Sequence, residues 1–431
     1  MRTKFTWRVR NRWVTLWSIL LLALGWQGLR FSESVRANAD VPSQASQADS
    51  ERDRFGGTRA VAAKGTGFFR VEQIDGRWWF ITPEGNGFIS MGMNHFDLAA
   101  LKHKDNIHIF RNRYGGSNDR YIVEGVAKPL REWGFNTIGW TQESVSGRWL
   151  DPKTLLQHSH EWSPQQLQLT GLPFIYNLHF ADIERFNMNP FYPDVFDEDF
   201  ENWADYVARS VCVDLASEPF LLGYADVTLP AFLRKAPGSW AENLNLEDPQ
   251  DRKKLERIVR RYFEVTTQAI RRYDPNHMIF GPRFENPPNT PDWTIEIAGE
   301  YFDVILCNLF VTPEDIETKL SEWHKRSTRP ILLSDMAFLA PTELLKVSPG
   351  SAAYVPDQKA RGEAYQAFAS KALSHPFILG WHWCAYLENR ARKSGVRNYM
   401  DEPYWDCVKR MQDFNLNHLY ESALGATSRQ R

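Results

Sequence analysis

Cysteine is scarce in this chain, with four residues among 431. Cys307 and Cys384 fall on or beside expected core strands, and Cys212 and Cys407 fall in expected helices. No spacing among them resembles a cluster of metal ligands, so the sequence predicts no metal centre. One disulfide could form, and the sequence does not assign its partners.

The chain also lacks an excess of basic over acidic residues. The formal net charge is −2. Residues 1–39 hold seven Lys/Arg and one acid, so the remaining 44 basic and 52 acidic residues carry a net charge of −8. This balance argues against a nucleic-acid partner, and it suits a neutral polymer better than an acidic one.

The N-terminus has the three parts of an export signal. A basic stretch ends at Arg12, an apolar core covers residues 13–29, and Ala-Asn-Ala at 37–39 forms a small-x-small cleavage site. We expect residues 1–39 to be a cleaved signal peptide. Retention as a membrane anchor is the alternative, although the apolar run is short for a span. Either way we expect the body in the periplasm or the extracellular space, with no membrane contact after cleavage.

Residues 40–62 are polar and aperiodic, so we expect a flexible linker there, followed by one domain over residues 63–424. This domain begins with a β-hairpin at 68–82, where Asp75-Gly76 supplies the tight turn. Short apolar strands then alternate with amphipathic helical stretches. The expected strands are residues 88–94, 136–140, 173–178, 221–226, 278–282, 303–308, 331–335 and 377–383.

Eight strand–helix units close most simply into a (β/α)8 TIM barrel, so we predict an α/β fold of this type with an N-terminal β-hairpin extension. The alternative is a doubly wound open sheet. No glycine-rich phosphate turn follows the first expected strand, which argues against that alternative. We expect no cofactor, and the sequence leaves the oligomeric state open.

Catalytic groups in such barrels stand at the C-terminal ends of the strands. The residues expected there combine acids, hydrogen-bonding amides and imidazoles, and flat aromatic rings. This mixture is typical of a sugar-binding cleft, because aromatic faces stack on sugar rings while polar groups bind hydroxyls. The candidates are Asn94, His95, Trp140, Glu143, His179, Asp226, Arg283, Glu285, Asn308, Asp335, Trp381 and Trp383.

Two of these candidates have open alternatives. Glu285 could be a loop acid paired with Arg283 rather than a catalyst. Trp381 and Trp383 are two residues apart on one strand, so both point to the same face. We expect that face to be the barrel interior rather than the helix layer.

Six segments resemble, in the same order, parts of the β-agarases of glycoside hydrolase family 50, and more loosely the retaining glycosidases of clan A. The resemblance covers about residues 66–420. It implies a (β/α)8 barrel with an acid/base glutamate after strand four and a nucleophilic glutamate at the end of strand seven. The segments are DGRWWFITPEGNGFISMGMNH, LREWGFNTIGW, FLLGYADVTLP, YFDVILCNLF, RPILLSDMAF and FILGWHWCAYLENR.

This chain departs from the family pattern at both catalytic positions. With the segments aligned on Leu229-Pro230, Thr228 stands where the family has its acid/base glutamate. Asp335 stands where the family has its nucleophile, one methylene shorter. Threonine cannot donate a proton near neutral pH, so the donor would have to be Asp226, Glu285 or Glu143, in that order.

Two functions follow from the resemblance and the departures. The first is an exported glycoside hydrolase acting on a polysaccharide or oligosaccharide, with Asp335 as nucleophile or base. The second is a carbohydrate-binding pseudoenzyme of the same fold, because the usual acid/base glutamate is absent. In both cases the partner is a glycan.

Overall fold

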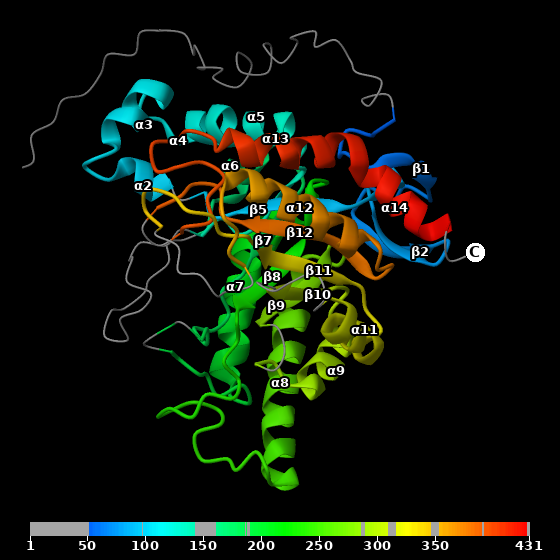
Figure 1. Cartoon of the computed structure of the whole chain (residues 1–431). Helices are drawn as coiled ribbons and strands as arrows, with labels where there is room; N and C mark the ends of the chain where they lie inside the picture. The colour runs from blue at the N-terminus through cyan, green and yellow to red at the C-terminus, as the bar shows by residue number, and fades with distance from the viewer. Residues whose placement is uncertain are drawn as a thin grey trace, which may run out of the picture. The chain divides into compact units, whose positions relative to one another are not determined.

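The computed structural model describes residues 51–96, 98–142, 161–185, 187, 190–285, 289–308, 316–345, 353–389 and 392–428. Its centre is a closed barrel of parallel strands in the order β10-β11-β12-β5-β6-β7-β8-β9, which confirms the predicted (β/α)8 fold. In Figure 1 these strands lie inside a layer of helices. The barrel strands are β5 (Ser90–Asn94), β6 (Thr137–Ile138), β7 (Phe174–Asn177), β8 (Leu221–Thr228), β9 (Met278–Glu285), β10 (Ile305–Asn308), β11 (Ile331–Met336) and β12 (Ile378–Cys384).

In the part of the chain that the structure describes, the helices follow the strands, as the alternating pattern predicts, and three of them are short π-helices. The longest helix among the described residues is α8, seen beside β8 and β9 in Figure 1. The helices are α2 (Leu98–Lys102), α3 (Ile107–Tyr114), α4 (Asn118–Arg120), η2 (Tyr121–Ala127), α5 (Lys128–Glu132), α6 (Pro164–Thr170), α7 (Glu198–Leu215), α8 (Pro249–Tyr273), α9 (Asp292–Tyr301), η3 (Ile316–Leu320), α11 (Ser321–Ser327), α12 (Gln358–Leu373), α13 (Trp405–Asp413), η4 (Phe414–His418) and α14 (Leu419–Ser428).

An antiparallel sheet precedes the barrel, with the strand order β1-β4-β3-β2. The predicted hairpin is present in it, and the turn residues Asp75 and Gly76 both have positive φ. Phe80 and Phe88 of this sheet pack with Phe280 of β9 in one buried cluster, so the sheet covers the N-terminal end of the barrel. Its strands are β1 (Thr58–Ala62), β2 (Arg70–Ile74), β3 (Arg77–Ile81) and β4 (Asn86–Phe88).

The expected linker over residues 40–62 is wrong at its C-terminal end, because residues 58–62 form β1 and pair with β4. Asp53, also inside the expected linker, is buried and accepts backbone hydrogen bonds from Phe55 and Gly57. Its other oxygen accepts the hydroxyl of Thr82 at 2.5 Å. The polar composition of this segment did not predict that its groups form hydrogen bonds with one another and with Thr82. The expected signal peptide lies outside the described residues.

Apolar periodicity explains how the helices pack onto the barrel. In α8, for example, Leu255, Val259, Tyr262 and Phe263 are buried while the intervening residues are mostly charged. This spacing of three and four residues places one stripe of the helix against the strands. In the described part of the chain, no helix is long and apolar enough to cross a membrane.

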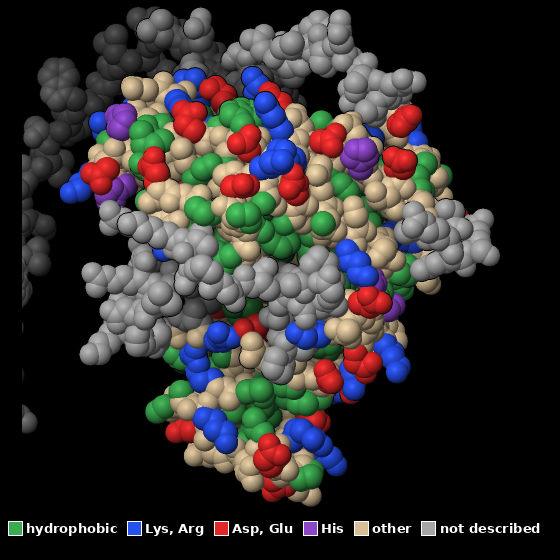
Figure 2. All heavy atoms as spheres, viewed as in Figure 1, with side chains coloured by type: hydrophobic (Ala, Val, Ile, Leu, Met, Phe, Trp, Pro, Cys, Tyr) green, Lys and Arg blue, Asp and Glu red, His purple; other side chains and the backbone are tan. Residues whose placement is uncertain are grey.

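All four cysteines are buried, and each is a free thiol. On the face drawn in Figure 2, acidic and basic side chains are intermixed.

Candidate active site

The carboxyl group of Asp335 lies at the centre of a cluster of polar side chains at the C-terminal end of the barrel. The register between β10 and β11 shifts between Cys307 and Asn308, and such an irregularity re-aims nearby side chains. Asp335 Oδ1 accepts a hydrogen bond from Asn94 Nδ2 on β5 at 3.0 Å, and Oδ2 lies 3.2 Å from Arg283 Nη2 on β9. Neither β5 nor β9 is adjacent to β11, so these contacts cross the barrel interior.

Asp335 is buried and yet ionised. Burial raises the pKa of its carboxyl group, but the neighbouring His95 and the positive charge of Arg283 outweigh that effect. Together they hold the pKa well below its usual range. His95 Nε2 lies 3.8 Å from Asp335 Oδ2. A permanently charged carboxylate is suited to act as a nucleophile or a base, and not as a proton donor.

Arg283 connects Asp335 to Thr228, the residue at the expected acid/base position. Arg283 Nη1 donates to Thr228 Oγ1 at 3.3 Å, and Nη2 donates to the main-chain carbonyl of Ser334 at 3.0 Å. The guanidinium also lies over the ring of Trp140, 4.5 Å from its centre. At the position where the resemblance implies a glutamate, the side chain is therefore a hydroxyl that accepts a hydrogen bond from a buried cation.

Asn94 is held at both ends of its amide. Besides its bond to Asp335, Nδ2 donates to the carbonyl of Ser334 at 2.8 Å, and Oδ1 accepts the main-chain N–H of Trp140 at 2.9 Å. Gly139 provides the space for this arrangement, since a Cβ atom there would stand 2.0 Å from Asn94 Oδ1. Asn94 is thus fixed with its donor group facing Asp335.

The barrel interior beneath this group is closely packed. A cavity of about 10 Å³ remains between side chains that include Asn177, Arg283 and His382. This is about the room of one water molecule. His382 Nε2 lies 2.9 Å from Ser90 Oγ, and burial lowers the pKa of His382 to about 3, so its ring is neutral. A sugar ring would therefore have to bind above Asp335 rather than deeper in the barrel.

Glu161 is a site residue that the sequence did not reveal. Its carboxylate accepts hydrogen bonds from the main chain and the hydroxyl of Thr141, just beyond β6. Its Oε1 is buried without a hydrogen-bond partner among the described residues, and His179 Nε2 lies 3.9 Å from it. Burial raises the pKa of Glu161 to about 7. Glu161 follows no expected strand, so only the fold brings it back to the barrel end.

His179 and Trp140 lie together beside Glu161. Their rings meet edge to face with 6.2 Å between centres. His179 Nε2 is also 3.2 Å from Asn177 Nδ2 at the end of β7. The predicted residues Asn94, His95, Trp140, Arg283 and Asp335 thus form one connected group, which His179 and Glu161 extend.

Asp226 has a different environment from Asp335. Its Oδ2 accepts the hydroxyl of Tyr262 on α8 at 2.5 Å, so the carboxyl group is directed toward the helix layer. Burial raises the pKa of Asp226 to about 7, and the hydrogen bond from Tyr262 opposes that rise. Within the described residues, no hydrogen bond or ion pair joins Asp226 to Asp335, and the two carboxyl groups belong to separate hydrogen-bond networks.

Three predicted residues remain: one is ion-paired at the edge of the site, one is buried next to Ser334, and one lies outside the described residues. Glu285 forms an ion pair with Arg185 and accepts Asn289 Nδ2 at 2.7 Å, so its partner is not Arg283. Asn308 accepts the hydroxyl of Ser334 at 3.1 Å. Glu143 lies outside the described residues.

The expectation that Trp381 and Trp383 line the barrel interior is wrong. Trp381 Nε1 donates to the hydroxyl of Tyr365 on α12, and the ring of Trp383 also packs against Tyr365. Both indoles are fully buried among the helices. Their shared face was predicted correctly, but the residue between them, His382, is the one that faces the interior.

His95, Asp335 and Cys384 place one possible metal-ligating atom each within 4.8 Å of one another. Burial raises the pKa of the Cys384 thiol well above its ordinary value, so the thiol is protonated. A protonated thiol and the adjacent Arg283 guanidinium are both unfavourable for a dication. The three groups are better described as a hydrogen-bonded cluster around Asp335.

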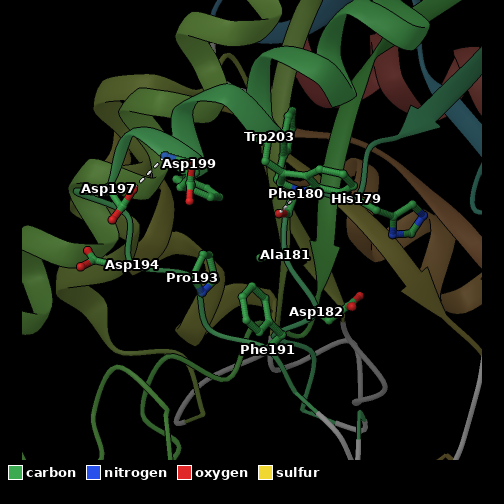
Figure 3. A pocket seen from close by; sticks show the side chains of 11 residues that line it. His179, Phe180, Ala181, Asp182, Phe191, Pro193, Asp194, Asp197, Asp199 and Trp203 are labelled. Carbon is green, nitrogen blue, oxygen red and sulfur yellow. Dashed lines mark hydrogen bonds between the residues drawn. The ribbon is translucent and has the colours of Figure 1, made fainter. Parts of the chain in front are cut away.

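A larger pocket of about 480 Å³ lies next to this group, between the end of β7 and the start of α7. Figure 3 shows its aromatic side chains facing a common space and several aspartates around it. We call it the α7 pocket. Its lining residues are His179, Phe180, Ala181, Asp182, Phe191, Pro193, Asp194, Asp197, Asp199, Phe200 and Trp203.

Comparisons with known proteins confirm the resemblance to agarases. No family model matches the sequence. Among curated proteins, Beta-agarase B of Vibrio sp. (strain JT0107) is 20% identical over 470 residues, which cover 82% of this chain and 48% of that protein. The chain therefore spans about half the length of this curated relative.

Three solved structures share the fold. An exo-beta-agarase is 18% identical with a TM-score of 0.68, covering 87% of this chain and 68% of that one. BpGH50 is 19% identical with a TM-score of 0.69, covering 89% and 90%. The agarase AgWH50C is 17% identical with a TM-score of 0.67, covering 86% and 66%. At these identities the likeness establishes the (β/α)8 architecture.

Proposed function

We propose that this protein is an exported, agarase-like glycoside hydrolase that cleaves a polysaccharide or oligosaccharide. The observation that carries this proposal is the buried, ionised carboxylate of Asp335, held by Asn94 and Arg283 at the C-terminal end of the barrel. The sequence and fold likeness to agarases supports the same reaction class. The basic, apolar and small-residue pattern of residues 1–39 supports export.

Asp335 would serve as the nucleophile of a retaining reaction or as the base that activates water in an inverting one. The two mechanisms differ in carboxyl separation, about 5 Å against about 6.5–9.5 Å. An aspartate in place of glutamate withdraws the carboxylate by about 1.5 Å, which leaves more room for a water molecule. In either case Asn94 and Arg283 orient the carboxylate without neutralising it by proton transfer.

Glu161 is the best-supported proton donor among the described acids. A general acid must be protonated near the working pH, and burial raises the pKa of Glu161 to about 7. Its Oε1 is not used in a hydrogen bond to the described residues, and it lies beside His179 at the barrel end. Asp226 has a similar pKa but is bonded to Tyr262, and Glu285 is bound to Arg185.

The central test replaces Asp335 with Asn and measures new reducing ends on a panel of neutral and sulfated polysaccharides, agarose included. We expect at least a 1000-fold loss of turnover on the substrate that the wild type cleaves. Asp335→Glu is the matched variant, since it keeps the charge and restores the family's longer side chain. Thermal melting and oligosaccharide binding verify that both variants are folded. Full activity of Asp335→Asn would remove the assignment.

A carbohydrate-binding pseudoenzyme is the second candidate. The observation that favours it is Thr228, which stands at the family's acid/base position and accepts a hydrogen bond from Arg283. This function predicts saturable binding of an oligosaccharide by the wild type, measured by calorimetry, with no reducing ends released. Detectable turnover that depends on Asp335 would exclude it.

A further inference from the structure

The proposed hydrolysis at Asp335 does not involve the α7 pocket. Its volume of about 480 Å³ is in the range of small-molecule binding sites. Phe191 is 67% exposed and Trp203 is 48% exposed, although both residues are large and apolar. Exposed apolar surface gathered in a concave site is typical of a surface that a ligand covers.

Trp203 is held as a rigid flat surface at one side of the pocket. Its Nε1 donates to the main-chain carbonyl of Phe180 at 2.9 Å, as Figure 3 shows. Its other side stacks on Tyr206, one turn further along α7, with 5.7 Å between ring centres. Because the indole is fixed before any ligand arrives, a ring that stacks on it binds without the cost of ordering the side chain.

Apart from His179, the polar side chains of the pocket are carboxylates, which act as acceptors. Asp182, Asp194, Asp197 and Asp199 line it, and the lining includes no Lys or Arg among the described residues. Asp194 and Asp197 each use one carboxylate oxygen for a nearby backbone N–H, which leaves further acceptor capacity. Such a site accepts hydrogen bonds from hydroxyl groups and repels sulfate or carboxylate groups.

His179 places the pocket beside the candidate active site. This residue lines the α7 pocket and also contacts the ring of Trp140 and the carboxylate of Glu161. In Figure 3 the imidazole points away from the cluster of Phe191 and Pro193. A chain of several linked rings could therefore occupy the barrel end and the pocket together.

We propose that the α7 pocket is a binding subsite for an uncharged saccharide, in which Trp203 stacks on a sugar ring and the aspartates accept its hydroxyl groups. The choice of a saccharide rests on the proposed function. The subsite holds a part of the glycan that is remote from the bond near Asp335, so it contributes affinity for longer chains rather than chemistry.

The test measures binding by calorimetry to the Asp335→Asn variant, so that no probe is consumed. The probes are a neutral agarose-derived hexasaccharide, the corresponding disaccharide, a sulfated carrageenan hexasaccharide and a chitosan hexamer. We expect Trp203→Ala to weaken hexasaccharide binding about 10-fold, which corresponds to about 1.4 kcal/mol, and to leave the disaccharide unaffected. Trp203→Phe should retain most of the affinity, because it keeps a flat face.

Trp405→Ala is the matched control, because Trp405 is an indole of similar exposure, 51%, on α13 and is not part of the pocket lining. It should bind the hexasaccharide like the parent. Unchanged hexasaccharide affinity in Trp203→Ala would overturn the subsite, as would preference for the sulfated or the cationic probe. The absence of binding by every probe would overturn it too.

The result of the binding test for the subsite can be distinguished from the result of the turnover test for the proposed hydrolysis. If the wild type releases no reducing ends but hexasaccharide binding depends on Trp203, the subsite stands and the hydrolase assignment fails. If the wild type cleaves a glycan and Trp203→Ala keeps full affinity, the hydrolase assignment stands and the subsite fails.

Discussion

Asp335 and Glu161 are both buried acids, but their surroundings shift their pKa values in opposite directions. Asp335 has Asn94, His95 and the Arg283 cation as close partners, and these favour its charged form. The hydrogen bonds from Thr141 and Gln142 and the positive charge of Arg283 offset the burial of Glu161 only in part, so its pKa rises to about 7. Two acids whose environments push their pKa values apart are the pattern expected of a base and an acid in one site.

We predict that Glu161→Gln lowers the turnover of the cleaved glycan by at least about 100-fold. Glu161 donates a proton only while it is protonated, so wild-type activity should fall as the pH rises through about 7. The variant should lose this alkaline limb and should retain more activity on an aryl glycoside with a good leaving group. Asp226→Asn is the control and should keep the wild-type pH profile; a normal profile in Glu161→Gln would contradict the assignment.

Asp226 should affect stability rather than turnover. Its folded-state pKa of about 7 lies above its ordinary value, so its stabilising contribution is fully present at low pH and is lost as the pH rises through about 7. Asparagine mimics the protonated form and can still accept from Tyr262. The loss begins above the ordinary pKa of an aspartate and is complete near pH 7, so we predict that Asp226→Asn raises the unfolding free energy by on the order of 2 kcal/mol more at pH 8 than at pH 5. Denaturant titration at both pH values measures this difference, and equal effects at both would contradict it.

At the scale of single elements, helix α12 fixes the segment that follows β12. Arg361 on this helix is fully buried and donates to the carbonyls of Phe338, Ser394 and Gly395. Its guanidinium also lies over Trp383. One side chain therefore ties the loop after β11 and the loop after β12 to the same helix.

We predict that Arg361→Met destabilises the protein by about 2–4 kcal/mol, because methionine fills part of the volume but leaves buried carbonyls without donors. The measurement is the denaturant midpoint of unfolding. Lys359→Met on the same helix is the control, since Lys359 is largely exposed and should change stability by less than about 0.5 kcal/mol. Equal midpoints for the two variants would show that these bonds contribute little.

The barrel strands were predictable because each is a short apolar run followed by a polar residue. The face presented by a strand was harder to predict. A period of two places Trp381 and Trp383 together, but it does not say whether the helices or the interior receive them. Both faces of these strands are buried, so apolarity does not separate the two cases. The direction of the Asp226 side chain was equally hard to predict, because its hydrogen-bond partner Tyr262 is 36 residues away in the sequence.

At the scale of the whole molecule, the N-terminal sheet closes the end of the barrel opposite the candidate site. Phe55, which precedes β1, is 1% exposed and packs with Phe69 and Phe220. The sequence predicted the hairpin from its turn residues, but it gave no periodic signal for residues 51–57. Their order comes from long-range contacts such as the bond between Asp53 and Thr82.

We predict that a protein beginning at Lys64 is less stable than one beginning at Gln47, because it loses β1 and Phe55 and exposes the phenylalanine cluster beneath them. Burial of one phenylalanine alone is worth about 1.5–3 kcal/mol. Thermal melting together with binding of a hydrophobic dye measures the effect. The same melting temperature for both proteins would mean that this segment does not support the barrel.

The four separated thiols have a practical consequence for how the protein can be prepared. Since each sulfur is enclosed by packing and none is joined to another, no covalent cross-link has to form for the chain to reach its final shape. Reducing agents should therefore leave its melting behaviour unchanged, and synthesis in a reducing compartment should yield the same fold as synthesis in an oxidising one.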